Sequence, residues 1–253
     1  MSTQGTNPLS LERNPQLEYG KSVHPFVVCR FVFECCKKLE LDVLSTATAI
    51  TLFHSFYKSS RKKEVYDPYL IAGACIYLAG KVEDETEMRL RDVINVVHAT
   101  LHPCKEPLSH DSEYFMHREA LVEAELLLLR VLDFKVKFTH PHKYLLHYLK
   151  TLKDWIPIQT WSNFPIASTA WSLLQDFYHD PFLLECGPSK VALSCIYLTF
   201  KIFGLSVDHA MREDIWIKIL DEAVDMDDIS EICSRIMDVY KKEIKYILPL
   251  LVS

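Results

Sequence analysis

Glycine is scarce in this chain, with six residues among 253. No Asn-Gly or Asp-Gly pair occurs anywhere, although these pairs are the strongest short signals for a β-hairpin. Tight β-turns therefore have few residues on which to form. The composition favours helices over strands.

Long apolar runs and an excess of basic residues are also missing. No uninterrupted apolar stretch reaches the roughly 18 residues of a membrane-spanning helix, and the first residues lack the basic and apolar segments of a secretory signal. The net charge is −6 and the isoelectric point is near 6.0. Nucleic-acid-binding chains normally present a basic surface to the phosphates. We expect an intracellular protein, nuclear or cytoplasmic or both, that binds another protein and neither nucleic acid nor membrane.

Signatures of metal sites and enzymes are absent as well. None of the eight cysteines forms a Cys-x-x-Cys pair, and most lie in apolar helical stretches, which indicates reduced thiols. The densest histidine cluster, His140, His142 and His147, follows a His-Pro helix start and lacks the further ligands of a metal site. No phosphate-binding loop, nucleophile elbow or kinase Asp-Phe-Gly occurs. The sequence predicts no metal, no cofactor and no catalytic residue.

Apolar residues recur at spacings of three and four along most of the chain, as on the buried face of a helix. The clearest helix start is Asp67-Pro68, where a capping carboxylate precedes a proline whose missing N–H costs nothing in the first turn. The pattern predicts five helices in the first half of the chain, beginning near Val23, Ser45, Asp67, Leu90 and Ser112.

Two segments of the chain recur at a nearly constant offset. Residues 68–81, PYLIAGACIYLAGK, match residues 188–201, PSKVALSCIYLTFK, at seven of fourteen positions. Residues 48–57 match residues 169–178 at five of ten positions. Such self-similarity indicates a duplicated unit. The second copy is expected to have helices beginning near Pro141, Pro165, Pro188, Arg212 and Asp228.

The predicted fold is therefore all-α, with two five-helix domains in one chain. Residues 23–137 form the first domain and residues 138–253 the second. Residues 1–22 are polar and interrupted by prolines and glycine, which predicts a mobile N-terminal arm outside the core. The possible docking points of this arm are Leu9, Leu11, Leu17 and Tyr19.

The third-helix segment IAGACIYLAGKVEDE and the fifth-helix segment LVEAELLLLRVLDFKVKFTHPH, set in a repeated five-helix unit, resemble the cyclin box and its structural repeat. The resemblance covers about residues 23–245 and is nearest to the transcriptional cyclins. It implies a non-catalytic regulatory subunit that forms a heterodimer with a cyclin-dependent kinase and activates it. The partner implied is the tenth cyclin-dependent kinase.

Glu125 is the unusual charged residue of the predicted fifth helix. Its neighbours on the same helix face are aliphatic, Leu121 and Leu128 among them. Because an unpaired buried carboxylate is costly, Glu125 needs a nearby cation, backbone donors or a partner protein. An internal ion pair with Lys81 or Arg130 is one interpretation.

The cyclin resemblance adds a second interpretation. In cyclins, the lysine that ends the third helix and the glutamate of the fifth helix hold the kinase backbone near its mobile regulatory helix. Neighbouring apolar residues pack on the same kinase surface. Lys201, which occupies the repeat position of Lys81, has no such implied role. The kinase-binding residues implied by the resemblance are Lys81, Glu125, Leu129, Phe134 and Val136.

Two other functions stay open. A general transcription factor with the cyclin fold would bind DNA, but it predicts a basic chain with an N-terminal zinc ribbon. A metal-dependent hydrolase would use the histidines and carboxylates, but it needs a complete set of ligands.

The first predicted helix, HPFVVCRFVFECC, departs from the Met-Arg-Ala-Ile-Leu pattern with which cell-cycle cyclins dock substrates. This departure disfavours substrate docking on that helix.

Overall fold

The computed structural model describes residues 17–60, 65–109, 111–205 and 213–251. These residues form α-helices and short 3-10 helices, with one isolated β-bridge and no strand. The all-α prediction is confirmed for them. The α-helices that precede residue 138 are α1 (Pro25–Lys38), α2 (Val43–Ser59), α3 (Pro68–Val82), α4 (Leu90–Leu101) and α5 (Ser112–Val131).

The later part of the chain contains the expected helices and a further short one. Its α-helices are α6 (His142–Trp155), α7 (Ile158–Asn163), α8 (Ile166–Phe177), α9 (Pro188–Phe203), α10 (Glu213–Leu220) and α11 (Met226–Tyr246). The 3-10 helices are η1 (Tyr19–Lys21), η3 (Pro181–Glu185) and η4 (Leu248–Leu250). Helix α7 was not predicted. It buries no residue, and Ile158 is 75% exposed, so the segment carries no apolar periodicity to detect.

Two helix starts show why the sequence begins its helices where it does. The His24 Nδ1 atom accepts the Phe26 N–H at 3.2 Å, and the Asp67 Oδ1 atom accepts the Tyr69 N–H at 3.0 Å. In both cases a proline follows the capping residue and occupies the first turn. Cap and proline together satisfy or remove the free N–H groups of a helix start.

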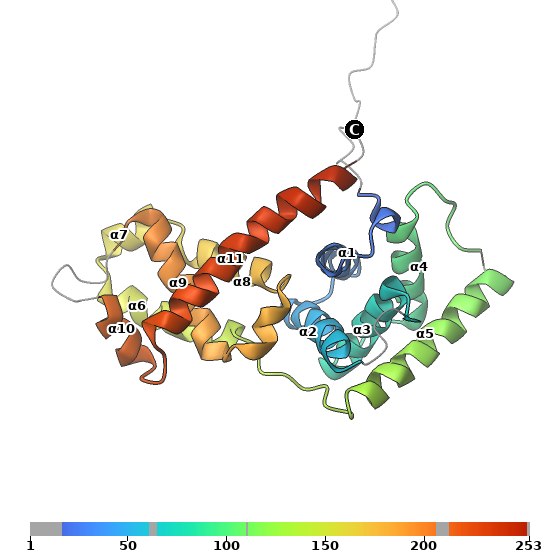
Figure 1. Cartoon of the computed structure of the whole chain (residues 1–253), viewed down its shortest axis with the longest axis horizontal. Helices are drawn as coiled ribbons and strands as arrows, with labels where there is room; N and C mark the ends of the chain where they lie inside the picture. The colour runs from blue at the N-terminus through green and yellow to red at the C-terminus, as the bar shows by residue number, and fades with distance from the viewer. Residues whose placement is uncertain (1–16, 61–64, 110, 206–212, 252–253) are drawn as a thin grey trace, which may run out of the picture.

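Helices α1 to α5 pack around α3, which is the most buried helix of this group, and α6, α8 and α11 pack around α9. Figure 1 shows two lobes, with α11 running from the second lobe towards α1. The division between residues 137 and 138 stays a prediction. It falls in the connector between α5 and α6.

The predicted arm is wrong at its inner end. Tyr19 is 1% exposed, its hydroxyl donates to Glu34 at 2.6 Å, and its carbonyl accepts the Tyr69 hydroxyl at 2.6 Å. An aromatic ring with two satisfied polar atoms is a core residue, not a docking point. Leu17 pairs with Leu251 in the isolated bridge. Residues 1–16, with Leu9 and Leu11, lie outside the described residues.

Two histidines, the buried His54 and the partly buried His140, join the two lobes. The His54 Nε2 atom bonds to the Tyr178 carbonyl at 2.9 Å. His140 bonds through Nε2 to the Thr48 hydroxyl at 2.8 Å and through Nδ1 to the Tyr178 hydroxyl at 2.9 Å. Burial lowers the pKa of both imidazoles, so they join the lobes as neutral groups.

The cysteines are free thiols, as expected, and five of the eight are buried. Burial raises their pKa, to about 12 for Cys36. Within the described residues, no helix is long and apolar enough to cross a membrane.

Candidate functional site

Lys81 and Glu125 form an ion pair where α3 ends against the middle of α5. The Lys81 Nζ atom lies 2.5 Å from the Glu125 Oε1 atom. The lysine side chain is 46% exposed and the glutamate side chain 11%. The ammonium also lies 4.0 Å from the centre of the Tyr77 ring, at cation–π distance. The cation that Glu125 requires is thus supplied by Lys81, one of the two candidates from the sequence.

Helix α5 holds Glu125 at the edge of its buried face. Leu121, Ala124 and Leu128 are buried, whereas Val122 and Leu126 are 38% and 49% exposed. The carboxylate therefore stands between an apolar interior and the solvent. Within the described residues, the hydrogen bonds of the two charged groups run only to each other. The second carboxylate oxygen and the remaining ammonium N–H groups are available to another molecule.

The turn after α5 presents a large aromatic side chain to solvent. Phe134 is 69% exposed and has a φ of 58°, and Asp133 before it has a φ of 56°. The Phe134 N–H donates to the Leu129 carbonyl at 2.9 Å, which fixes the turn. Left-handed backbone is costly for side chains other than glycine, and it recurs at functional sites. This turn displays an apolar group that the fold itself does not bury.

The residues predicted for kinase binding lie along one edge of the first lobe. Lys81 and Glu125 are in direct contact, and Leu129 follows Glu125 one turn later on α5. Phe134 bonds to Leu129 through the backbone, and the half-buried Val136 donates its N–H to the Phe134 carbonyl at 3.1 Å. The geometry brings these residues together, and their role remains a prediction.

The sequence analysis missed two exposed apolar residues of the same edge, Val122 and Leu126. Leu126 follows Val122 by four residues and Leu129 follows Leu126 by three, which is the spacing of one helix face. An apolar face opposite the buried one was the signal that could have found them. With Phe134 they form an apolar strip beside the ion pair, here called the α5 strip: Val122, Leu126, Leu129 and Phe134.

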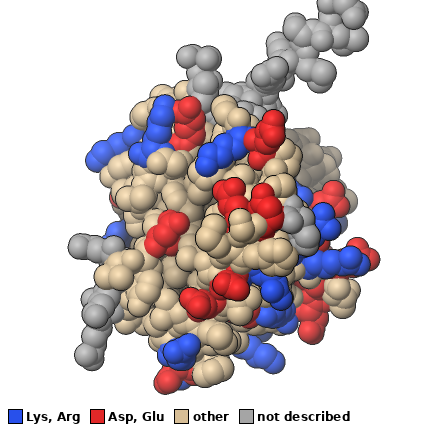
Figure 2. All heavy atoms as spheres, turned by 90° about the vertical axis from the view of Figure 1, so that its right-hand side faces the viewer, with Lys and Arg blue, Asp and Glu red and all other residues tan. Residues whose placement is uncertain are grey.

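The end of the molecule where α4 and α5 lie carries charges of both signs. Figure 2 shows acidic and basic side chains interspersed over that face, without a continuous basic stripe. Within the described residues, no group of three or more His, Cys, Asp or Glu side chains is placed to hold a metal ion.

A comparison with known protein families finds a match for the first lobe. The family model "Cyclin, N-terminal domain" matches residues 17–137. The first lobe is thus similar to the N-terminal domain of cyclins. The match includes the buried Tyr19, in agreement with the packing of residues 17–22 against the first lobe.

Cyclin relatives are similar over most of this chain. Cyclin-L2 of Mus musculus is 29% identical over 222 residues, which cover 86% of this chain and 40% of the relative. Cyclin-K of Homo sapiens is 27% identical over 217 residues, which cover 84% of this chain and 36% of the relative. The chain thus spans two fifths or less of the length of these two cyclins.

A solved structure, the yeast RNA polymerase II CTD kinase CTDK-1 complex, contains a chain with a similar fold. The TM-score is 0.64 at 16% identity, and the match covers 90% of this chain and 68% of the other. The tandem cyclin-box fold, predicted from the repeat together with the family resemblance, is thereby confirmed.

Proposed function

We propose that this chain is a cyclin, a non-catalytic regulatory subunit that binds and activates a cyclin-dependent kinase. The observation that carries the proposal is the half-exposed ion pair of Lys81 and Glu125 beside the α5 strip. An apolar strip next to charged groups with unused hydrogen-bonding atoms has the anatomy of an interface hot spot.

In the proposed contact, the charged pair and the apolar α5 strip have different roles. The Lys81 ammonium donates to kinase carbonyl groups, and the free oxygen of Glu125 accepts kinase N–H groups. The α5 strip covers the apolar surface next to the kinase regulatory helix. A kinase needs that helix in place before phosphoryl transfer is efficient. A subunit that binds only this arrangement raises its population by the difference in affinity for the two states.

Within the family we propose a position nearest to cyclin Q, also called cyclin M. The segments that support it are DPYLIAGACIYLAGKVED, VLDFKVKFTHPHKYLLHYL and TAWSLL. The proposed partner is the tenth cyclin-dependent kinase, in a heterodimer that acts in the nucleus on growth signalling or transcription. Similarity to cyclins L2 and K, at 27–29% identity, supports the transcriptional side of the family.

The test is co-purification of the chain with the tenth and other cyclin-dependent kinases, followed by a kinase assay on each complex. The variants are Lys81→Glu, Glu125→Lys and the double exchange of both residues. Lys201→Glu is the matched control, because Lys201 ends α9 as Lys81 ends α3 and also lies near a tyrosine ring, 5.3 Å from the centre of Tyr197.

The double exchange separates an interface from an internal ion pair. If the pair only stabilises the fold, exchange restores the attraction and restores binding. If both groups contact the kinase backbone, exchange leaves each kinase group facing the wrong partner. We expect each single variant and the double exchange to lose at least about thirtyfold in affinity, the size of a hot spot, and Lys201→Glu to bind normally. Recovery of binding in the double exchange would contradict the proposed contact.

A further inference from the structure

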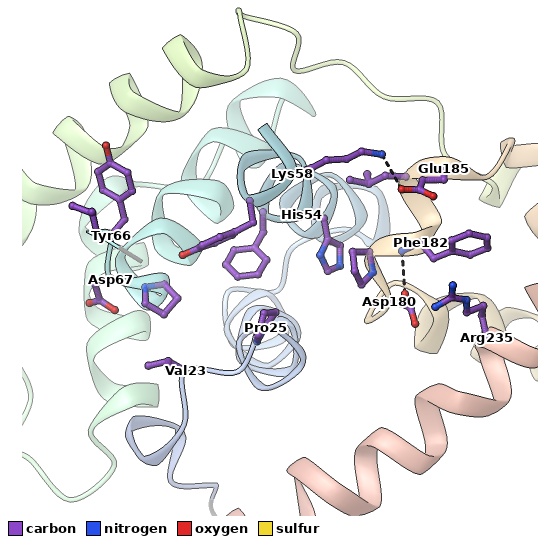
Figure 3. A pocket seen from close by; sticks show the side chains of 16 residues that line it. Val23, Pro25, His54, Lys58, Tyr66, Asp67, Asp180, Phe182, Glu185 and Arg235 are labelled. Atoms are coloured by element: carbon purple, nitrogen blue, oxygen red, sulfur yellow. Dashed lines mark hydrogen bonds and ion pairs between the residues drawn. The ribbon is translucent and has the colours of Figure 1, made fainter. Parts of the chain in front are cut away.

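A groove of about 1000 Å³ lies between the two lobes. Its walls come from the start of α1, the end of α2, the start of α3, η3 and α11. Figure 3 shows the lining side chains as a row that crosses the molecule from Asp67 to Arg235. This volume is at the upper end of the range for ligand sites, about 300–1,000 Å³. The groove shares no lining residue with the ion pair or the α5 strip.

Aromatic and proline side chains make up most of the middle of the groove. Phe53 and Tyr57 come from α2, Pro25 from α1, and Pro181 and Phe182 from η3. A concave apolar surface with a few polar groups is the usual form of a recognition site. Both lobes contribute to it, so the groove exists only when they are docked together.

Most charges around the groove are already neutralised by neighbours. Lys58 and Glu185 pair across the two lobes at 3.2 Å (Figure 3). The buried Asp180 carboxylate pairs with Lys242 at 2.7 Å. These two contacts stabilise the walls and leave little charge for a ligand.

Two charges, one at each end of the row, form no ion pair within the described residues. Asp67 accepts the Tyr69 N–H through Oδ1 and has no ion pair within the described residues. The Arg235 guanidinium lies 4.5 Å from the centre of the Phe182 ring. Its acidic neighbour Asp238 forms an ion pair with Lys241 at 2.7 Å, and Arg235 itself has no ion pair among the same residues. Both residues are exposed, and they lie at opposite ends in Figure 3.

We propose that this groove binds an extended peptide segment of a partner protein. The segment has apolar side chains in its middle, a basic residue at the end that meets Asp67 and an acidic residue at the end that meets Arg235. An extended peptide places successive side chains at regular intervals, which suits an apolar trough with one charge at each end. Charge complementarity fixes the direction of the segment.

Fluorescence anisotropy with defined peptides tests this assignment on the full chain. The probes are labelled eight-residue peptides with an apolar centre and one lysine and one glutamate at the ends, in both orders. The comparison probes have the same centre with two lysines or two glutamates. The variants are Asp67→Asn, which preserves the helix cap because asparagine caps as well as aspartate, and Arg235→Glu. The control is Lys150→Glu, an exposed residue of α6 outside the groove.

We expect wild type and Lys150→Glu to bind one of the mixed-charge peptides best. Asp67→Asn should weaken that peptide about threefold to fivefold, as expected for a partly exposed ion pair. Arg235→Glu should change the preference to the peptide with two lysines, a gain that an unfolded variant cannot produce. The assignment is overturned if no probe binds wild type, or if neither substitution changes the order of preference. Kinase co-purification of the same variants keeps this result separate from the proposed kinase contact.

Discussion

At the scale of single residues, Phe134 combines a large exposed side chain with an unfavourable backbone conformation. It is 69% exposed and its backbone is left-handed. Each left-handed residue other than glycine costs about 1–2 kcal/mol. An exposed ring in this conformation does not stabilise the fold. A ring in this position could instead pack on the surface of a partner.

Phe134→Asn tests this interpretation. Asparagine tolerates left-handed backbone, so we expect the free energy of unfolding in urea to stay the same or to rise by up to about 1 kcal/mol. Kinase affinity should fall about tenfold or more, because the aromatic anchor is lost. A variant that binds the kinase as wild type does would remove Phe134 from the interface.

Tyr57 shows the opposite condition, a polar atom with too few partners. Its hydroxyl oxygen is buried and has no hydrogen-bond partner among the described residues. Burial raises the pKa of this hydroxyl to about 12, which keeps it neutral. An unsatisfied buried hydroxyl costs about 1–3 kcal/mol. We therefore expect Tyr57→Phe to leave the free energy of unfolding unchanged or to raise it by about 1 kcal/mol, measured by urea titration. A loss of stability would mean that the hydroxyl has a partner in solution.

At the scale of helices, Gly73 sets how closely α5 approaches α3. A Cβ atom at this position would lie 3.0 Å from the Leu121 Cδ1 atom. At the corresponding position of the second lobe the chain has Leu193, which is fully buried. Helix α3 thus approaches α5 closely at Gly73, whereas α9 has a large buried side chain at the equivalent position.

Gly73→Val should force α5 away from α3. We expect a loss of about 1–3 kcal/mol in the free energy of unfolding, the usual cost of overpacking. Kinase affinity should also fall, because Glu125 moves with α5 while Lys81 stays on α3. Gly20→Val is the control, since a Cβ atom there has open space around it. Equal stability of the two variants would show that the α3–α5 contact is looser than described.

The sequence predicted helices well where one face is buried. It predicted poorly where a helix buries nothing, as in α7, or where a residue is buried by residues distant in the sequence. The repeat predicted α8 and α9 because their apolar faces were duplicated. It did not align α5 with α11. Tyr19 was misplaced because its partners, Glu34 and Tyr69, are remote in the sequence.

The residues of the candidate site could be predicted from the sequence, but the ion pair that two of them form could not. Family resemblance pointed to Lys81 and Glu125, and the aliphatic neighbours of Glu125 indicated that it needed a cation. Only the structure distinguishes Lys81 from Arg130 as that cation. The groove between the lobes could not be predicted, because its walls come from five elements whose arrangement depends on how the lobes dock.

At the scale of the whole molecule, buried histidines make the free energy of unfolding depend on pH. Burial lowers the pKa of His142 and of His179 from the ordinary 6.5 to about 4. The unfolded chain therefore binds more protons than the folded chain between pH 6.5 and 4. Stability is full above pH 6.5 and is lost as the pH falls through this window. For each histidine the complete loss amounts to about 3 kcal/mol.

Urea unfolding at pH 7.5 and pH 5.5 measures this dependence. One pH unit below the unfolded pKa, each histidine should cost about 1 kcal/mol of stability. His142→Gln should remove the share of the loss that is due to His142. The double substitution of His142 and His179 by glutamine should remove the shares of both and leave the contribution of other histidines with lowered pKa, such as His54 and His140. A double variant with the same pH dependence as wild type would assign the effect to other groups.

The bridge between Leu17 and Leu251 affects how the two lobes can move relative to each other. The Glu18 N–H donates to the Leu250 carbonyl at 3.1 Å, so the first and last described segments are tied to each other. The lobes are joined once by the connector between α5 and α6 and a second time through this tie and α11. Two tethers in parallel share any load that pulls the lobes apart. We therefore expect the two lobes to resist a hinge motion that separates them. Rotation of one lobe relative to the other should be the easier motion.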